Sequence, residues 1–426
     1  MIERYDIRQI SQIFAPKEKI KNFLLIEKAL LTIYTSKGTK PQECNLTIDA
    51  QLLKEIAQEE QLTKHDVFAF INVISRKLSP INEQYFHFGL TSSDLVDTNN
   101  ILMIKSAWSI INQDIEKLLK ILLKLAIKYQ NLNTLSRTHG QAAQITKFGL
   151  RFLLSFQNLK TIHLNLQAAA KSLLKAKLSG ASGNYLDLSY AEAKKISQIL
   201  DLDLHDLTTQ VIPRHLFTNF FFQVLAFINE ISRFAQDLRL LSMSGIEEVS
   251  EAFSEGQKGS SAMPQKRNPI NLEQIMGLSR LASSSINVLL ENNLLWLERD
   301  LTHSSNERII FQDNLTLLCY VVRKFQDILK NLKINEANIV RNIELTYGAA
   351  WSSTIMNYLI KEHHYSRHSA YELLKEYSLQ ARELKIDIFV LLEKNDIIKR
   401  GETENLRKLN DLESRIKLIY SQVIKA

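Results

Sequence analysis

Apolar residues recur every three or four positions along four long stretches of the chain, residues 104–125, 217–241, 278–296 and 315–332. This spacing places the apolar side chains on one side of an α-helix. Each stretch is therefore predicted to form a helix tens of ångströms long. Long helices that lack the length and apolarity of a membrane span pack into bundles. We expect an all-α chain of three domains with a central bundle of long helices.

The second stretch also carries apolar residues away from its main stripe, at Phe220, Phe222, Leu225 and Phe227. One chain would struggle to cover all of these side chains. Their number therefore predicts self-association through the long helices. We assign Phe220 and Trp296, which ends the third stretch, to the core or to a subunit interface.

The composition agrees with a helical fold, because the chain has 12 Gly and 6 Pro among 426 residues. Average usage is about 7% Gly and 5% Pro, so few tight turns are available for a barrel or a sandwich. The best candidates for domain boundaries lie near Gly89 and Gly348. They predict an N-terminal helical domain at 1–90, a central long-helix bundle at 91–345 and a C-terminal helical domain at 346–426.

Charge and cysteine content exclude several classes of protein. The net charge of +7 comes from basic residues spread along the chain, which is typical of a soluble surface, and we expect no nucleic-acid partner. Cys44 and Cys319 cannot form a disulfide framework or a Cys-x-x-Cys site. The charged N-terminus does not resemble a signal peptide, and the most apolar stretch, 220–228, is too short to cross a bilayer. We expect a cytoplasmic protein without a membrane partner.

Polar, glycine-containing segments lie between the apolar stretches, and in a helical protein such segments are the best candidates for function. The longest, 255–269, contains Gly259, paired serines and Lys266. Its backbone N–H groups near 259–262 could hold an anion, with Lys266 adding positive charge. A solvated surface loop explains the same composition equally well. Both interpretations stay open on composition alone.

A pair of histidines four residues apart, His364 and His368, matches the spacing of a zinc-binding helix. No third ligand stands at a suitable spacing, and Arg367 would repel a cation. Ser366 reads instead as the residue that caps the start of a helix. We therefore predict no metal site.

Three segments resemble the fumarase/aspartase superfamily. Residues 259–269, Gly-Ser-Ser-Ala-Met-Pro-Gln-Lys-Arg-Asn-Pro, follow its pattern Gly-Ser-Ser-x-Met-Pro-x-Lys-x-Asn-Pro, and residues 87–98 and 137–140 resemble its other two conserved segments. Further segments are similar to the adenylosuccinate lyase family within that superfamily, namely 1–5, 64–67, 209–210 and 298–308. The resemblance extends to about residue 345 and is weak beyond it.

The resemblance implies a homotetramer with a core of long helices, in which three subunits contribute to each active site. It implies β-elimination of fumarate from two nucleotides, without a metal or an organic cofactor. Adenylosuccinate would give AMP. Succinylaminoimidazole carboxamide ribotide would give aminoimidazole carboxamide ribotide.

The resemblance also implies roles for individual residues. Ser260 would be the general base, its alkoxide stabilised by backbone N–H groups and cations, and His139 the general acid, because histidine titrates near neutrality. The substrate-binding residues would be Arg4, Tyr5, Arg299, Ser304 and Arg308 for phosphate and ribose; Lys266 and Asn268 for the succinyl carboxylates; His65, Asp66, Thr91, Ser92 and Gln210 for the base and succinyl parts; and, in addition, Lys64, His87, Ser261 and Glu273.

Structural interpretations of four of these residues stay open. His139 could cap a helix or lie in the core, and His65 could begin a helix together with Asp66. His87 could orient the neighbouring chain, and Glu273 could occupy the first turn of a helix, where carboxylates are favoured.

The sequence departs from the family at Gln265, where histidine is usual, at Lys64, which replaces an arginine, and at 213–215. The alternative functions are another lyase of the superfamily, such as an argininosuccinate lyase or a carboxymuconate cycloisomerase, and a non-catalytic structural member. The predicted phosphate-binding residues argue against the first alternative, and the intact Ser260 and His139 argue against the second.

Overall fold

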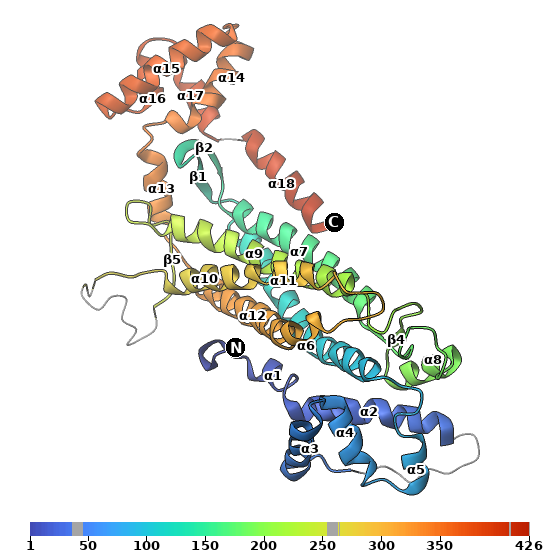
Figure 1. Ribbon diagram of the computed structural model, residues 1–426. Coiled ribbons are helices and arrows are strands. Elements are labelled where there is room, and N and C mark those ends of the chain that lie inside the picture. The colour runs from blue at the N-terminus through green and yellow to red at the C-terminus, as the bar shows by residue number, and fades with distance from the viewer. Residues whose placement is uncertain (36–45, 254–262, 264, 409, 426) are drawn as a thin grey trace. The chain divides into compact units, whose positions relative to one another are not determined.

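The computed structural model describes residues 1–35, 46–253, 263, 265–408 and 410–425, and these residues are mostly helical (Figure 1). The expected all-α class is confirmed. The chain forms two compact units, each drawn from three segments. Unit 1 comprises Met1–Glu116, Thr161–Asn229 and Gly277–Arg323, and unit 2 comprises Lys117–Lys160, Glu230–Met276 and Lys324–Ala426. The domain boundaries expected near residues 90 and 345 stay a prediction.

Three of the four predicted long helices are confirmed, as α6 (Ser92–Lys128), α9 (Arg214–Leu241) and α12 (Thr302–Asn331). The third is wrong in extent. Its stretch divides into α10 (Ile270–Ser284) and α11 (Ile286–Glu291), because the helix is interrupted at Ser285. Trp296 follows α11 and is 80% exposed, so it does not belong to the core of this chain. A further long helix, α7 (Gly149–Leu173), has no counterpart among the predicted ones.

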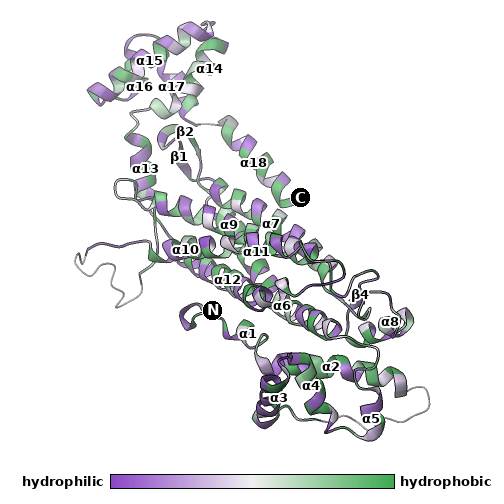
Figure 2. Ribbon diagram, viewed as in Figure 1, coloured by the Kyte–Doolittle hydropathy of each residue, from purple (hydrophilic) through white to green (hydrophobic). Residues whose placement is uncertain are grey.

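The apolar side chains beside the main stripe of α9 are mostly covered by the chain itself. Phe220, Leu225 and Phe227 are buried, and the Phe220 ring meets Trp108 edge-on with their centroids 6.1 Å apart. Only Phe222 of this set is exposed. The expectation that one chain could not cover these residues is therefore wrong for three of the four. Figure 2 shows hydrophobic and hydrophilic residues mixed along the long helices.

The rest of unit 1 consists of short elements whose ends are set by local hydrogen bonds. Asp49 caps α3 by accepting a 2.9 Å hydrogen bond from the Leu52 backbone N–H, and Ser189 and Glu192 form a capping box on α8. Strands β3 and β4 pair in parallel. These elements are η1 (Glu3–Tyr5), α1 (Arg8–Ser11), α2 (Pro16–Thr35), α3 (Ala50–Thr63), α4 (Asp66–Ser75), α5 (Pro80–Tyr85), β3 (Lys175–Ala176), α8 (Tyr190–Ile199) and β4 (Asp203–Leu204).

Unit 2 contains an antiparallel hairpin that packs on short helices. Leu135 and Ile145 of the hairpin form a small core with Ala350, while Leu359 and Leu374 belong to a separate core between the C-terminal helices. The additional elements are β1 (Asn133–Thr138), β2 (Gln141–Lys147), β5 (Val249–Ser250), β6 (Lys333–Ile334), α13 (Glu336–Glu344), η2 (Ala349–Trp351), α14 (Ser352–Glu362), α15 (Arg367–Leu384), α16 (Ile388–Lys394), α17 (Arg400–Lys408) and α18 (Asn410–Lys425).

The predicted start of a helix at Ser366 is confirmed. Its hydroxyl accepts a hydrogen bond from the Ser369 backbone N–H and caps α15. His364 lies outside that helix, with φ near 55°, so it does not share a helical face with His368. Across the described ranges, the helices fall short of the length and apolarity that a membrane-spanning helix requires.

Candidate active site

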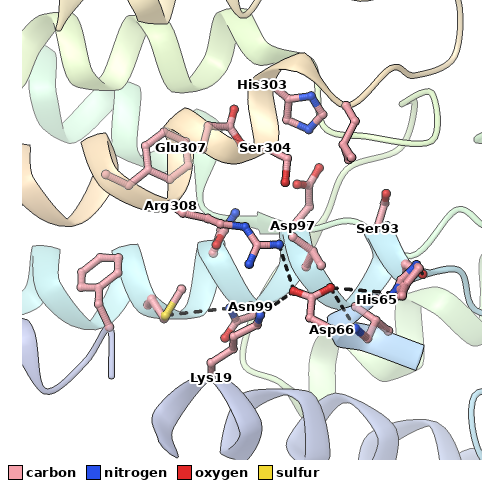
Figure 3. A pocket seen from close by; sticks show the side chains of 18 of the residues that line it. Lys19, His65, Asp66, Ser93, Asp97, Asn99, His303, Ser304, Glu307 and Arg308 are labelled. Carbon is pink, nitrogen blue, oxygen red and sulfur yellow. Dashed lines mark hydrogen bonds and ion pairs between the residues drawn. The ribbon is translucent and has the colours of Figure 1, made fainter. Parts of the chain in front are cut away.

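Unit 1 contains a cavity of about 620 Å³ at the beginnings of three helices, α4, α6 and α12 (Figure 3). The N-terminal backbone N–H groups of a helix lack partners within the helix and carry partial positive charge, so they favour anions. Four cationic residues line the same cavity: Lys19, Lys64, Arg299 and Arg308. Four acidic residues, Glu60, Asp66, Asp97 and Glu307, line the cavity as well. The helix termini, rather than an excess of cationic side chains, therefore suit this cavity to an anionic ligand.

Asp66 joins two of these cations in the first turn of α4. Its Oδ2 lies 2.6 Å from Lys19 Nζ and 2.9 Å from Arg308 Nη2 (Figure 3). Burial alone would raise the pKa of Asp66, but the two cations outweigh it and hold this pKa well below its usual range. The carboxylate is therefore ionised and fixes the positions of Lys19 and Arg308.

His65 both begins α4 and faces the cavity. Its Nδ1 accepts a 3.2 Å hydrogen bond from the Phe68 backbone N–H, which caps the helix. The opposite ring nitrogen, Nε2, lies 3.5 Å from the Ser92 hydroxyl at the start of α6. The helix-start interpretation therefore accounts for Nδ1, whereas Nε2 lies on the side of the ring that faces the cavity.

A buried group of charges underlies the cavity, with Arg214 at its centre. The guanidinium donates two hydrogen bonds of 2.8 and 2.9 Å to Asp97, two of 3.0 and 3.1 Å to Glu307, and one of 2.9 Å to the Ile212 carbonyl. All five of its N–H groups are thus satisfied. Asp97 and Glu307 also line the cavity.

The two carboxylates differ in their protonation. Burial opposes ionisation of Asp97, but Arg214 and a hydrogen bond from the Ile212 backbone N–H lower its pKa below the usual value. Burial raises the pKa of Glu307 to about 7, against the opposing effect of Arg214. The sequence marked residues 213–215 only as a departure from the family, so this role of Arg214 was missed.

His303, in the first turn of α12, was also missed. Only 3% of its surface is exposed, and it lines the cavity beside Ser304 (Figure 3). Burial, with a contribution from Arg214, lowers its pKa to about 4, so the imidazole is neutral near pH 7. Sequence reasoning had considered only its neighbours in the segment 298–308.

The cavity brings together seven of the predicted substrate-binding residues, and an eighth contacts one of them. Arg299 Nη1 donates a 2.8 Å hydrogen bond to Gln210 Oε1, and Gln210 Nε2 in turn donates to the Ala181 carbonyl at 2.8 Å. The seven that line the cavity are Lys64, His65, Asp66, Ser92, Arg299, Ser304 and Arg308.

Four other predicted residues of unit 1 lie outside the lining of the cavity. The Thr91 backbone N–H donates to Asp94 Oδ2 at 2.7 Å, within the turn that begins α6. His87 Nδ1 lies 2.7 Å from Glu27, in accord with its structural interpretation. Arg4 and Tyr5 belong to η1, and the Tyr5 ring meets the Tyr320 ring edge-on.

His139 stands at the tip of the hairpin in unit 2. Thr138 pairs with Gln141, so His139 and Gly140 form a two-residue turn, with φ of 52° and 77°. Positive φ at both positions is typical of a type I′ turn. His139 is exposed, which excludes the core interpretation, and it lies in a hairpin turn, which excludes the helix-cap interpretation. A catalytic role for it stays a prediction.

Ser260 and Ser261 lie outside the described residues. Lys266 is exposed and Asn268 half-buried in the segment that leads into α10. The start of α10 is fixed by Glu251, which accepts 2.7 Å hydrogen bonds from the Leu272 backbone N–H and from the Asn271 side chain. Sequence reasoning did not single out Glu251.

Glu273 occupies the first turn of α10, as its structural interpretation expected, and its carboxylate lies 3.4 Å from Arg239.

Among the described residues, no cluster of three or more His, Cys, Asp or Glu side chains is arranged to hold a metal ion.

Comparisons with known proteins extend these observations. A family model described as a lyase matches residues 46–282. Adenylosuccinate lyase from Thermotoga maritima is 34% identical over 98% of this chain and 97% of its own, and that from Bacillus subtilis is 32% identical over 93% of each. The fumarate lyase structure from Mesorhizobium sp. BNC1 superposes with a TM-score of 0.87 and 18% identity, covering 100% of both chains.

A second structure, the 3-carboxy-cis,cis-muconate lactonizing enzyme from Pseudomonas putida, superposes with a TM-score of 0.86 over 99% of this chain and 98% of its own. At 21% identity this likeness concerns the fold alone. The curated relatives are more similar in sequence and match over nearly the full length. Together with the lyase match, they show that the chain belongs to the adenylosuccinate lyase family of carbon–nitrogen lyases.

Proposed function

We propose that this protein eliminates fumarate from adenylosuccinate, giving AMP, and from succinylaminoimidazole carboxamide ribotide, giving aminoimidazole carboxamide ribotide. The observation that carries the proposal is the cavity of unit 1, where three helix N-termini meet Lys64, Arg299 and Arg308. A nucleotide phosphate is the anion that both helix termini and guanidinium groups bind well. Relatives that cover nearly the whole chain bear the name of this activity.

The cavity would hold the phosphate and the ribose. Arg308 donates from Nη2 to Asp66, which orients the guanidinium and leaves its other N–H groups for phosphate oxygens. Arg299 is held in the same way by Gln210. Ser304, in the first turn of α12, adds a hydroxyl. Arg4 and Tyr5 do not line this cavity, so we assign them to the site of another subunit.

The elimination itself requires a base and an acid. Ser260 would remove the proton from the carbon beside the succinyl carboxylate. The electron pair of that C–H bond would form the new double bond as the C–N bond breaks. The leaving nitrogen would take a proton from His139. Lys266 and Asn268 would hold the succinyl carboxylates and stabilise the negative charge that develops there.

Assembly into a cytoplasmic homotetramer, with three subunits at each site, is part of the proposal. The support comes from exposed apolar residues in the segment between α11 and α12. Leu294, Trp296 and Leu297 are 70%, 80% and 90% exposed, respectively, and Leu301 is exposed as well. A cluster of exposed apolar side chains of this kind marks a protein interface more often than free surface.

The test is an assay of the purified full-length protein with adenylosuccinate, in which the ultraviolet absorbance change reports formation of AMP and fumarate. We expect turnover with this substrate and none with argininosuccinate or a carboxymuconate. The Ser260→Ala variant is the control for contaminating activity. Absence of turnover by the folded wild-type protein, or turnover of argininosuccinate alone, would contradict the proposal.

A further inference from the structure

Two polar atoms in the wall of the cavity are buried and lack a hydrogen-bond partner among the described residues. They are Nδ1 of His303 and Nε of Arg299. Each belongs to a residue that lines the cavity, and the His303 side chain is almost fully buried. A buried polar atom without a partner lowers stability, and native structures seldom leave one unexplained.

The two atoms differ in what they require. Arg299 Nε–H is always a donor, and its Nη1 is already held by Gln210. His303 is neutral near pH 7, because burial and the nearby Arg214 and Arg299 disfavour its charge more than Asp97 and Asp300 favour it. A neutral imidazole has one donor nitrogen and one acceptor nitrogen. A partner able both to donate and to accept therefore satisfies Nδ1 in either tautomer.

We propose that His303 and Arg299 together bind a ribose hydroxyl of the nucleotide, so that His303 positions the sugar. This inference rests on the proposed function. A hydroxyl can accept a hydrogen bond from Arg299 Nε–H and donate one to His303 Nδ1, whereas an ionised phosphate oxygen only accepts. Ser304, expected at the phosphate and ribose, is the next residue along α12, and both residues line the cavity.

The experiment measures binding of AMP, 2′-deoxy-AMP and 3′-deoxy-AMP to the full-length protein by calorimetry. In the wild type we expect one of the deoxynucleotides to bind roughly tenfold more weakly than AMP. Loss of the hydroxyl leaves the buried atoms of His303 and Arg299 without a hydrogen-bond partner, and a penalty of this size is typical. In His303→Leu, AMP itself should weaken by a similar factor. The His303→Leu variant should then no longer bind AMP more tightly than that deoxynucleotide.

Two further variants make the test specific to one ring nitrogen. His303→Asn places an amide near the position of Nδ1 and should keep the preference for AMP. His303→Gln places its amide near the position of Nε2 and should lose that preference. A Leu variant that fails to fold leaves this comparison intact.

The outcomes separate the inference from the proposed function. If the wild type binds all three nucleotides equally, or if the Gln and Asn variants keep the same preference, the role of His303 is overturned while the proposed function stands. If the wild type binds no AMP, both are overturned.

Discussion

Arg214 explains how two carboxylates can be buried beneath the cavity of unit 1. Each carboxylate receives two hydrogen bonds from the guanidinium, so neither Asp97 nor Glu307 lacks a partner. Two negative groups nevertheless share one positive charge. Glu307 relieves this excess by binding a proton near neutral pH, which its raised pKa permits. The floor of the cavity is then close to neutral when an anionic ligand arrives.

The first prediction at the residue scale concerns Arg308. Replacing it with Gln should raise KM for adenylosuccinate about 10- to 100-fold and leave kcat within a few-fold, because phosphate binding is lost equally from the ground and transition states. Steady-state kinetics measures both constants. Arg76→Gln is the matched control, since Arg76 forms an exposed ion pair with Glu59 away from the cavity. A fall in kcat alone would contradict a phosphate-binding role.

The second residue-scale prediction concerns the pH dependence of stability. The pKa of Glu307 is raised from 4.5 to about 7 by folding, so the folded state binds this proton more tightly than the unfolded state. Its contribution is fully present below about pH 4.5 and is lost as the pH rises through about 7. The unfolding free energy of the wild type, relative to Glu307→Gln, should therefore fall by up to about 3 kcal/mol across this range.

Urea unfolding at several pH values measures this difference. Gln keeps one of the two oxygens that accept hydrogen bonds from Arg214 and cannot titrate. Loss of the second hydrogen bond lowers stability equally at every pH, whereas loss of the titrating group removes the dependence on pH. Glu298→Gln, which changes an exposed carboxylate, should follow the wild-type curve throughout. Parallel curves for the wild type and Glu307→Gln would show that Glu307 keeps an ordinary pKa.

At the scale of elements, the hairpin of β1 and β2 determines how His139 is presented. Its turn needs positive φ at two successive residues, and only Gly, Asn, Asp and, less readily, His adopt this conformation at modest cost. His139, one of the two residues of the turn, is thus also the predicted general acid. The side chain extends from a tip whose backbone is fixed by paired strands.

The element-scale prediction separates these two requirements. His139→Asn should keep the thermal unfolding temperature, because Asn suits the turn, while turnover falls by about 100-fold or more. Gly140→Val should instead lower that temperature, because φ at this position is 77°, although no atom lies within 4 Å of the added Cβ. Normal turnover by His139→Asn would show that the acid is another residue.

The long helices were predictable where apolar residues keep to one side. Helix α7 was missed because its apolar residues occur on several sides: Phe152 and Leu159 are buried, whereas Leu154 and Leu164 are exposed. The hairpin was missed because β1 is mostly polar and its His-Gly turn is a weaker signal than Asn-Gly. The break at Ser285 carries no glycine or proline to mark it.

The site was predictable only where a motif carried it. Lys64, Asp66 and Arg308 were expected as ligands from the resemblance, and the structure gathers them at one cavity. Arg214 and His303 follow from burial and from partners distant in sequence, which no local pattern reveals. Asp97, for example, lies 117 positions from Arg214.

At the scale of the whole molecule, the predicted site residues fall into two sets. The set that lines the cavity belongs to unit 1, whereas His139, Lys266, Asn268 and Glu273 belong to unit 2. Ser260, outside the described residues, belongs by sequence to the same segment as Lys266. Sites built from three subunits would combine these sets across chains.

The prediction at this scale is complementation between inactive variants. Ser260→Ala and His139→Ala should each be inactive alone and should regain part of the activity after mixing, dissociation and reassembly, because some sites then receive both intact residues. Activity and light scattering are measured on the same samples. Each variant reassembled by itself is the control. An active monomer, or mixing without any recovery, would contradict shared sites.

The ion pairs that Asp66 makes with Lys19 and Arg308 have a consequence for conformational entropy. Long cationic side chains lose up to about 2 kcal/mol of rotamer freedom when they become fixed. Here part of that loss accompanies folding, since Asp66 holds both side chains. If Arg308 binds the phosphate as proposed, little ordering of its side chain would be left for the binding step, so more of that contact would contribute to affinity.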